Sequence, residues 1–194
     1  MLAAVAHVPA DRPTELDELA LRRAVKGEAA AARALVEMYE VRVFALVSRM
    51  LPSRPRATVE DVAQETFLQV FRQLPRFDVG GPARLSTWIL TIAARRAIDE
   101  LRRQRPTLVA QPERMGESRG DERAVRREVV TAIEAALGEL SPELRAAFLL
   151  RELHGLEYVE IAVALDIDLG TVKSRLSRAR AQLRKRLAEV HHGS

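Results

Sequence analysis

The sequence predicts an all-α protein of two small helical domains joined by a flexible linker, with a helix-turn-helix in the C-terminal domain. Aromatic residues make up only 4% of the chain while Ala, Leu, Arg and Glu dominate, which favours helix over sheet. Apolar residues recur at helical spacing on both sides of one polar stretch that has no sustained period. We therefore expect domains over residues 14–104 and 123–190, joined by a linker over 105–122.

The first domain is expected to hold four helices whose ends are marked in the sequence. They run from Thr14 to Gly27, and over 28–51, 59–74 and 87–103. Thr14 and Ser86 are expected to cap the first and fourth helices, Gly27 to end the first, and Pro52 to end the second. The loop 75–85 contains two Pro and two Gly, so it cannot be regular.

The second domain is expected to hold four more helices. They run over 123–137, from 142 to about 155, over 158–165 and over 169–190. Ser141, Pro142 and Glu143 form a strong helix start, with a capping hydroxyl, Pro at the first position and an early acid. The last two helices, one short and one long with a short turn between them, form a helix-turn-helix.

The last helix has two distinct faces. The aliphatic residues of one stripe are Val172, Leu176, Ala179, Leu183 and Leu187. Small and basic residues lie on the other side, namely Ser174, Ser177, Arg178, Ala181 and Lys185. Seven basic residues and no acid fall between Lys173 and Arg186, whereas a merely solvated helix would include Glu for i,i+4 pairing. This pattern favours a helix that docks by its stripe and presents the other face to DNA.

A second basic stretch lies at the end of the first domain. Five Arg between positions 95 and 105 face only Asp99 and Glu100, although the whole chain has a net charge of just +4. Two basic patches on a nearly balanced protein indicate a polyanion that is contacted at two places. On charge alone, a solvated helix face is the alternative.

Several classes of protein and site are not expected. The chain has no Cys, so disulfides and thiolate metal sites are excluded, and no apolar run approaches the ~20 residues of a membrane span. The start of the chain lacks the basic flank of a secretory signal, so a cytoplasmic protein is predicted. The four His are scattered and no phosphate-binding Gly-rich loop or nucleophile elbow is present, so we expect no enzyme, cofactor or metal. His154 is expected to interact with the dipole at a helix C-terminus.

Three blocks of sequence carry a family resemblance. They are DVAQETFLQVFRQLPRFD, LSTWILTIAARRAIDELRR and LSPELRAAFLLRELHGLEYVEIAVALDIDLGTVKSRLSRARAQLRKRL. In order and spacing they resemble bacterial RNA polymerase sigma factors, and the two-domain layout is similar to the extracytoplasmic-function subgroup, with conserved regions 2 and 4. The resemblance covers roughly Glu18 to Leu187. It implies three partners, which are core RNA polymerase, promoter DNA and an anti-sigma protein.

The resemblance also implies roles for individual residues. Those expected to bind core polymerase are Asp61, Gln64, Glu65, Thr66, Phe67 and Val70. Those expected at the melted minus-10 element are Phe77, Asp78, Arg84, Leu85, Arg95, Arg96, Arg102 and Arg103. Those expected at the duplex minus-35 element are Thr171, Lys173, Ser174, Arg175, Ser177, Arg178 and Arg180. Among these, Arg175 and Arg180 are expected to touch phosphate or neighbouring protein.

Some roles stay open at this point. Trp88 can stack on a base, but its neighbours Ile89 and Ile92 favour a core role, and core packing is also favoured for Phe71. The cations at 184–186 can contact phosphate or solvent.

The chain departs from the family's usual pattern at five positions. Asp166 replaces a frequent Gly in the turn of the helix-turn-helix, where Asp can still adopt left-handed backbone angles. Glu157 replaces a Ser or Thr cap, Arg95 a frequent Asn, Leu85 a frequent Phe, and Ala32 a common aromatic residue. The resemblance therefore does not predict which minus-10 sequence this chain prefers.

Two other functions fit part of the sequence. A stand-alone helix-turn-helix regulator would use its first domain to sense a ligand or dimerise, but would not need the Arg residues of 95–105 beside a Gly-Pro loop. A regulator that binds polymerase without reading DNA would not need the basic face between Lys173 and Arg186.

Overall fold

The structure, a computed structural model, describes residues 15–81, 83–103 and 122–192. The predicted cap Thr14 lies outside these residues, and so does the predicted linker over 105–122 except for its last residue. Within the described residues all regular structure is helical, which confirms the predicted fold class. None of the helices in these ranges is long and apolar enough to cross a membrane.

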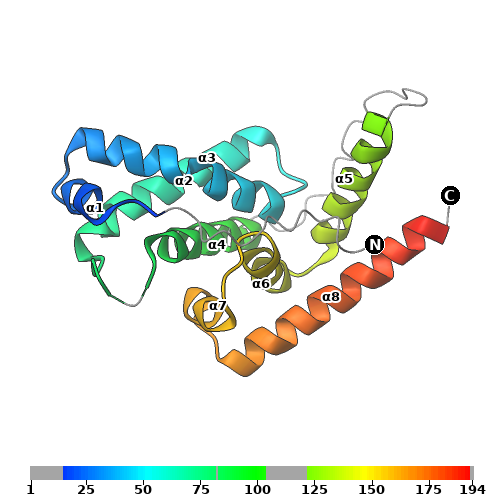
Figure 1. The fold of residues 1–194 in the computed structure, drawn as a ribbon. Helices are drawn as coiled ribbons and strands as arrows, with labels where there is room; N and C mark the ends of the chain where they lie inside the picture. Colours follow the sequence, from blue (N-terminus) through cyan, green and yellow to red (C-terminus); the bar gives the residue numbers. More distant parts are fainter. Residues whose placement is uncertain (1–14, 82, 104–121, 193–194) are drawn as a thin grey trace.

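The helices follow the order that the sequence predicts (Figure 1). The elements are α1 (Glu18–Val25), α2 (Ala29–Met50), α3 (Arg56–Gln73), the 3-10 turn η2 (Leu74–Arg76), α4 (Leu85–Arg103), α5 (Glu122–Glu139), α6 (Pro142–Glu152), α7 (Tyr158–Leu165) and α8 (Leu169–His192). Gly27 and Gly155 adopt positive φ angles of 82° and 68° and follow α1 and α6, as expected for C-terminal stops.

The helix starts differ from the prediction at three places. Asp17 caps α1, because its Oδ1 accepts a hydrogen bond from the backbone N of Ala20 at 2.9 Å. Helix α3 begins three residues earlier than expected, directly after Pro55. Helix α4 begins at Leu85, so Ser86 lies inside its first turn and is not the cap.

The Glu15 carboxylate, and not the Ser86 side chain, supplies the hydrogen-bond acceptor at the start of α4. Glu15 Oε2 accepts a hydrogen bond from the backbone N of Ser86 at 3.1 Å, and the Ser86 hydroxyl donates to Oε1. The Arg84 guanidinium lies 3.1 Å from the same carboxylate, and the Tyr39 hydroxyl donates to it at 2.9 Å. A negative charge is stabilised at a helix N-terminus, so Glu15 anchors α4 from 71 positions away in the chain.

The helices form two groups that touch each other. Helices α2, α3 and α4 pack together with α1 against α2, and we call α1–α4 the first bundle. Helix α8 packs on α5, α6 and α7, and we call α5–α8 the second bundle. Helices α6 and α7 also pack on α4, and α5 and α6 on α2 (Figure 1). The buried apolar residues of both bundles, from Leu16 to Leu183, form one continuous cluster.

A buried guanidinium joins the two bundles. Arg145 of α6 is only 5% exposed, and its Nη1 donates to the carbonyl oxygen of Met50 at 2.5 Å. Its Nη2 donates to the carbonyl oxygens of Gly138 at 2.7 Å and Leu140 at 3.0 Å, where α5 ends. Burial lowers the pKa of Arg145 to about 10, so the side chain is still a cation at neutral pH. The C-terminal carbonyl of α2 gains a charged donor that its own helix cannot supply.

His154, just after α6, is kept neutral. Burial, together with the positive charges of Arg42 and Arg49 on α2, lowers the pKa of His154 to about 3. Its Nε2 is buried and accepts no hydrogen bond from the described residues. His154 lies at the C-terminal end of α6, as expected, and its imidazole is neutral there, mainly because it is buried.

Replacing the buried cation should destabilise the chain. We expect Arg145→Met to lower the free energy of unfolding by about 3 kcal/mol, since three carbonyls, two of them in buried hydrogen bonds, lose a charged donor. The matched control is Arg22→Met, which removes an Arg whose side chain is 58% exposed in an i,i+4 pair with Glu18. The control substitution should lower the free energy of unfolding by less than about 0.5 kcal/mol. Urea titrations followed by circular dichroism measure both values, and equal losses would contradict the role of Arg145.

The low pKa of His154 predicts acid sensitivity. The unfolded chain takes up a proton at this residue near pH 6.5, whereas the folded chain does so only near pH 3. Stability therefore falls as the pH drops below about 6.5, by up to about 1.4 kcal/mol per pH unit from this group. Urea titrations at pH 7 and pH 5 should show a smaller loss for His154→Gln than for the parent chain. The carboxylates contribute equally to both proteins, so equal losses would refute the assignment.

Candidate nucleic-acid interface

The turn between α7 and α8 is closed by a left-handed Asp. Asp166 has φ 54° and ψ 55°, and it is the one non-glycine residue with positive φ in the described ranges. The backbone N of Ile167 donates to the carbonyl of Ala162 at 3.0 Å across this turn. The expectation that Asp replaces Gly here without loss of the turn is confirmed. Helices α7 and α8 therefore form the predicted helix-turn-helix.

Asp168 fixes the beginning of α8. Its Oδ1 accepts a hydrogen bond from the backbone N of Thr171 at 2.8 Å, and the Thr171 hydroxyl donates to its other oxygen. These bonds from the Thr171 hydroxyl and backbone lower the pKa of Asp168, so the cap is anionic at neutral pH. The Thr171 hydroxyl is thus occupied by the cap, whereas sequence reasoning assigned Thr171 to a DNA contact.

The two faces of α8 separate as the sequence predicts. Val172, Leu176, Ala179 and Leu183 are buried, and Leu187 is half-buried against the same cluster. The exposed side chains on the other face include Lys173, Ser174, Ser177 and Arg178. The Arg178 guanidinium is held over this face, because Nε donates to the Ser174 carbonyl and Nη2 to the Ser174 hydroxyl, both at 3.3 Å. This face offers hydroxyls and cations that can reach base edges and phosphates.

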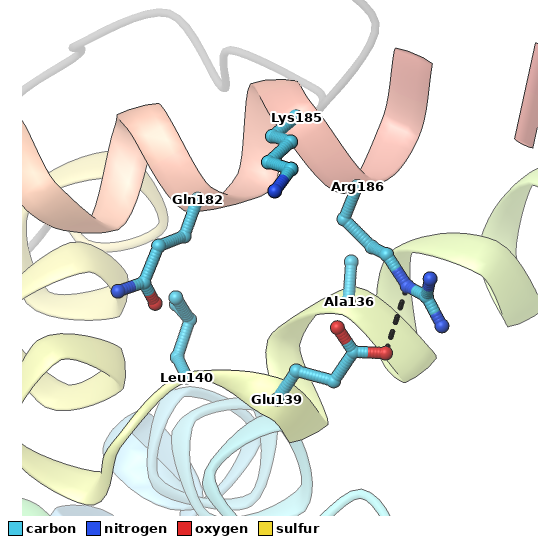
Figure 2. Close-up of a pocket in the computed structure, with 6 residues that line it drawn as sticks. All are labelled: Ala136, Glu139, Leu140, Gln182, Lys185 and Arg186. Atoms are coloured by element: carbon cyan, nitrogen blue, oxygen red, sulfur yellow. Dashed lines mark ion pairs between the residues drawn. The ribbon is translucent and has the colours of Figure 1, made fainter. Parts of the chain in front are cut away.

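Other cations of α8 are bound by the protein itself. Arg180 lies against Glu152 of α6, with Nη2 2.6 Å from Oε1, and this bond raises the pKa of Arg180. Arg186 pairs with Glu139 of α5 at 2.8 Å, beside a small hollow between the two helices that Gln182 and Lys185 also line (Figure 2). Arg180 therefore meets neighbouring protein, one of its two expected roles. Arg184 and Lys185 are exposed.

The loop before α4 rests on an aromatic pair. The rings of Phe77 and Trp88 have centroids 5.0 Å apart and are tilted by 47°. Both side chains are half-buried against the core, which supports the core role of Trp88. Asp78 is exposed, whereas Leu85 is only 5% exposed and belongs to the core. In this structure Leu85 has little surface to offer a base.

Three basic residues of α4, and Arg84 just before it, are hydrogen-bonded or paired within the protein. Besides Arg84 with Glu15, Arg96 donates to Gln69 at 3.3 Å and lies 3.9 Å from Glu65, both on α3. Two others reach the second bundle. Arg95 Nε donates to the carbonyl of Ala164 at 3.1 Å, and Arg102 Nη2 lies 3.1 Å from Glu143 Oε1. Arg103 is exposed.

The outer face of α3 contains part of the predicted polymerase-binding set. Asp61 is exposed, and so are Gln64 and Glu65 one turn later. Phe67 is half-buried. Thr66 and Val70 are fully buried, and the Thr66 hydroxyl donates to the Val62 carbonyl at 2.8 Å. A direct contact of these two residues with a partner is therefore not available in this structure, because they lie on the opposite side of the helix.

Sequence reasoning missed Leu68 on this face. Its side chain is 56% exposed, and it follows Asp61 by two helical turns. The helical spacing from Asp61 is the signal that could have identified it. Phe71, by contrast, is half-buried against the core, as expected.

The described residues hold no group of three or more His, Asp or Glu that could bind a metal ion. Among the acids named above, Asp168 accepts hydrogen bonds at a helix start, and five pair with Arg, namely Glu15, Glu65, Glu139, Glu143 and Glu152.

Comparisons with known proteins match both halves of the chain to regions of sigma-70 factors. The model of the family "Sigma-70 region 2" matches residues 35–107, and that of "Sigma-70, region 4" matches residues 131–183. The ECF RNA polymerase sigma-E factor of Salmonella typhimurium is 34% identical over 177 residues, which cover 84% of this chain and 90% of that protein. The ECF RNA polymerase sigma factor SigE of Mycolicibacterium smegmatis is 36% identical over 80% of this chain, which spans only 61% of that relative.

A solved structure has a similar fold. CnrH, in complex with the cytosolic domain of CnrY, superposes with a TM-score of 0.66 at 26% sequence identity. The match covers 89% of this chain and 97% of CnrH. The likeness therefore extends over both bundles.

The exposed face of α8 leads to a direct test on duplex DNA. If Arg178 reads a base, Arg178→Ala should weaken binding to a duplex selected from a random pool by about 1–3 kcal/mol. Binding to unrelated duplexes should change little. Fluorescence anisotropy at several salt concentrations measures both. An equal loss on every duplex, with a lower salt dependence, would instead make Arg178 a phosphate contact.

Proposed function

The chain belongs to the extracytoplasmic-function subgroup of bacterial RNA polymerase sigma factors, and on this basis we propose how its parts divide the work of that family. Residues 14–104 bind core RNA polymerase and the minus-10 element, and residues 123–190 bind the minus-35 element. The protein acts as a dissociable specificity subunit in the cytoplasm and does no chemistry of its own. Transcription initiation then depends on the chain because it brings polymerase to a promoter and helps to open it.

The observation that carries this proposal is the division of α8 into two faces. Its aliphatic stripe is buried, while Lys173, Ser174, Ser177 and Arg178 remain exposed on a helix anchored by Asp168. A helix-turn-helix places such a second helix in the major groove, where Arg and Lys pair with guanine and Ser with either partner of a base pair. Arg175, which is half-buried, is assigned to phosphate.

Helix α3 is the proposed docking site for core polymerase. Asp61, Gln64 and Glu65 supply polar contacts and Leu68 an apolar one, all on a single exposed face. Thr66, Phe67 and Val70 support this face from inside by packing. A mixed polar and apolar helix face suits a helical partner surface.

The loop 77–85 and α4 form the surface that is proposed to bind the minus-10 element. Opening a duplex costs a few kcal/mol per base that leaves the stack, and a basic surface along the displaced strand offsets that cost. Arg95, Arg96, Arg102 and Arg103 supply the positive charge, and Phe77 and Asp78 belong to the loop that would receive a base. Arg84 and Leu85 are assigned to holding this loop, through Glu15 and the core respectively.

An anti-sigma protein is the remaining proposed partner. CnrH, whose fold is similar, was solved with the cytosolic domain of CnrY bound. An anti-sigma protein would act on the present chain by covering the surfaces on α3, α4 and α8.

The test of the proposed function is run-off transcription with core polymerase from the source bacterium. Start sites mapped after overexpression of the chain supply the promoter DNA. Core plus the chain should give a promoter-dependent transcript that core alone does not give. Absence of both a transcript and a stable core complex would refute the proposal, and a core complex without DNA recognition would favour a polymerase-binding regulator.

A charge reversal on α3 tests the docking face separately. Asp61→Lys should weaken core binding by at least about tenfold, because it reverses the charge of an exposed acid on the proposed docking face, yet leave binding to the minus-35 duplex unchanged. Glu28→Lys is the matched control, since it reverses another exposed acid of the same bundle outside this face. Equal effects of the two variants on core binding would exclude a specific role of Asp61.

A further inference from the structure

Hydrogen-bond donors from two other parts of the chain converge on the Glu15 carboxylate. The backbone N and the hydroxyl of Ser86 donate to it, the Tyr39 hydroxyl donates at 2.9 Å, and Arg84 Nη2 lies 3.1 Å from Oε1. Ser86 and Tyr39 are only 2% and 1% exposed, whereas the side chain of Arg84 is 38% exposed. Of these three partners, Arg84 is therefore the one with room to turn outward.

Glu15 itself is held from the inside of the first bundle. The backbone N of Leu16, a buried residue, donates to the Tyr39 hydroxyl at 3.1 Å, and that hydroxyl donates to Glu15 Oε2. Burial raises the pKa of Tyr39, so the hydroxyl keeps its proton and remains a donor. The position of the carboxylate is thus fixed by groups other than Arg84.

Two guanidinium groups share this single carboxylate. Arg42 of α2 is half-buried, and its Nη1 has no hydrogen-bond partner among the described residues. Burial lowers the pKa of Arg42, the negative charge of Glu15 opposes that change, and the positive charge of Arg84 adds to it. Without the charge of Glu15, Arg42 and Arg84 would repel each other uncompensated. The more exposed Arg84 would then be the one to turn toward solvent.

Arg84 lies at the positive end of α4. Its carbonyl oxygen accepts a hydrogen bond from the backbone N of Trp88 at 3.0 Å, so its backbone is fixed where α4 begins. Helix N-termini attract phosphate, and a guanidinium pairs with phosphate through two parallel hydrogen bonds. Without Glu15, Arg84 would therefore bind the backbone of a nucleic-acid strand. Such a contact carries no sequence information, because every nucleotide offers the same phosphate.

We propose that Glu15 determines the specificity of the minus-10 surface by withholding Arg84 from phosphate. This inference rests on the proposed function, because it takes the loop 77–85 and α4 as the surface that binds the melted strand. Glu15 is a positioning residue, since it acts through Arg84 and does not touch the strand. If Arg84 paired with a phosphate instead, any strand would gain the same contact, and the loop that receives a base would lose its support.

Binding of single strands to the chain assembled with core polymerase tests this proposal. The probes are a fluorescent oligonucleotide with the minus-10 sequence of a mapped promoter and a scrambled oligonucleotide of the same composition. Glu15→Gln removes the charge but keeps an oxygen that can accept from Ser86. It should strengthen binding of the scrambled strand about fivefold at 0.1 M salt, because one more neutralised phosphate adds about 0.7 to the salt slope. The preference for the minus-10 strand should fall at least about twofold, since that strand also loses the supported loop.

Two further variants separate this effect from a loss of structure. Glu18→Gln is the matched control, because it neutralises an acid that pairs with Arg22 on the surface of α1. It should leave both affinities and the salt slope unchanged. The double variant Glu15→Gln with Arg84→Gln should return the scrambled strand to the affinity and slope of the parent chain. A general loosening of the loop would not be reversed in this way.

An unchanged or weaker affinity of Glu15→Gln for the scrambled strand, at the salt slope of the parent, would overturn the proposal, and so would a gain that survives in the double variant. Arg84→Gln alone is a second test that does not require Glu15→Gln to fold. A salt slope below that of the parent would show that Arg84 already contacts phosphate and is not withheld. If the parent complex does not prefer the minus-10 strand, the function proposed for this surface fails instead, and the slope of Glu15→Gln still reports whether Arg84 is released.

Discussion

The guanidinium of Arg145 is the interaction on which the relative placement of the two bundles depends. A buried cation needs hydrogen-bond acceptors, and here three carbonyl oxygens from two bundles accept from Nη1 and Nη2, while the buried Nε has no partner among the described residues. The planar fork of Arg fixes the directions of those carbonyls, which a Lys ammonium would not do. The end of α2, the end of α5 and the start of α6 are therefore set relative to one another. The position of α7 on α4 is then determined as well, because α6 leads into α7 through a short turn.

The Arg residues of α4 and α8 differ in what surrounds them. On α4, acids or carbonyls from α3, α6 and α7 lie within reach of Arg95, Arg96 and Arg102. On the exposed face of α8, Arg178 turns back to Ser174 of its own helix, and Asp168 is confined to the cap. The same type of side chain is thus held by protein in one place and presented to solvent in the other. Nearby acids, and not the number of cations, decide which surface is open to a polyanion.

The helices and the helix-turn-helix could be predicted because their signals are local. Periodicity placed Val172 and Leu176 on the buried side of α8, and the tolerance of Asp for left-handed angles anticipated Asp166. The roles of Glu15 and Arg145 could not be predicted, because each joins residues 71 or 95 positions apart. Thr66 shows a related limit. Spacing assigns a residue to a face of a helix, but only the neighbouring helices decide which face is covered.

The contact between Glu15 and the start of α4 changes where the first functional unit begins. The match to the region 2 family begins at residue 35, so it leaves out Glu15 and the whole of α1. A fragment cut at that boundary would keep α4 but lose the carboxylate that binds the Ser86 backbone, Arg84 and Tyr39. Glu15 therefore supports a loop that follows it by some 70 positions. A substitution at Glu15 would therefore alter the support of that loop without changing any residue in the loop itself.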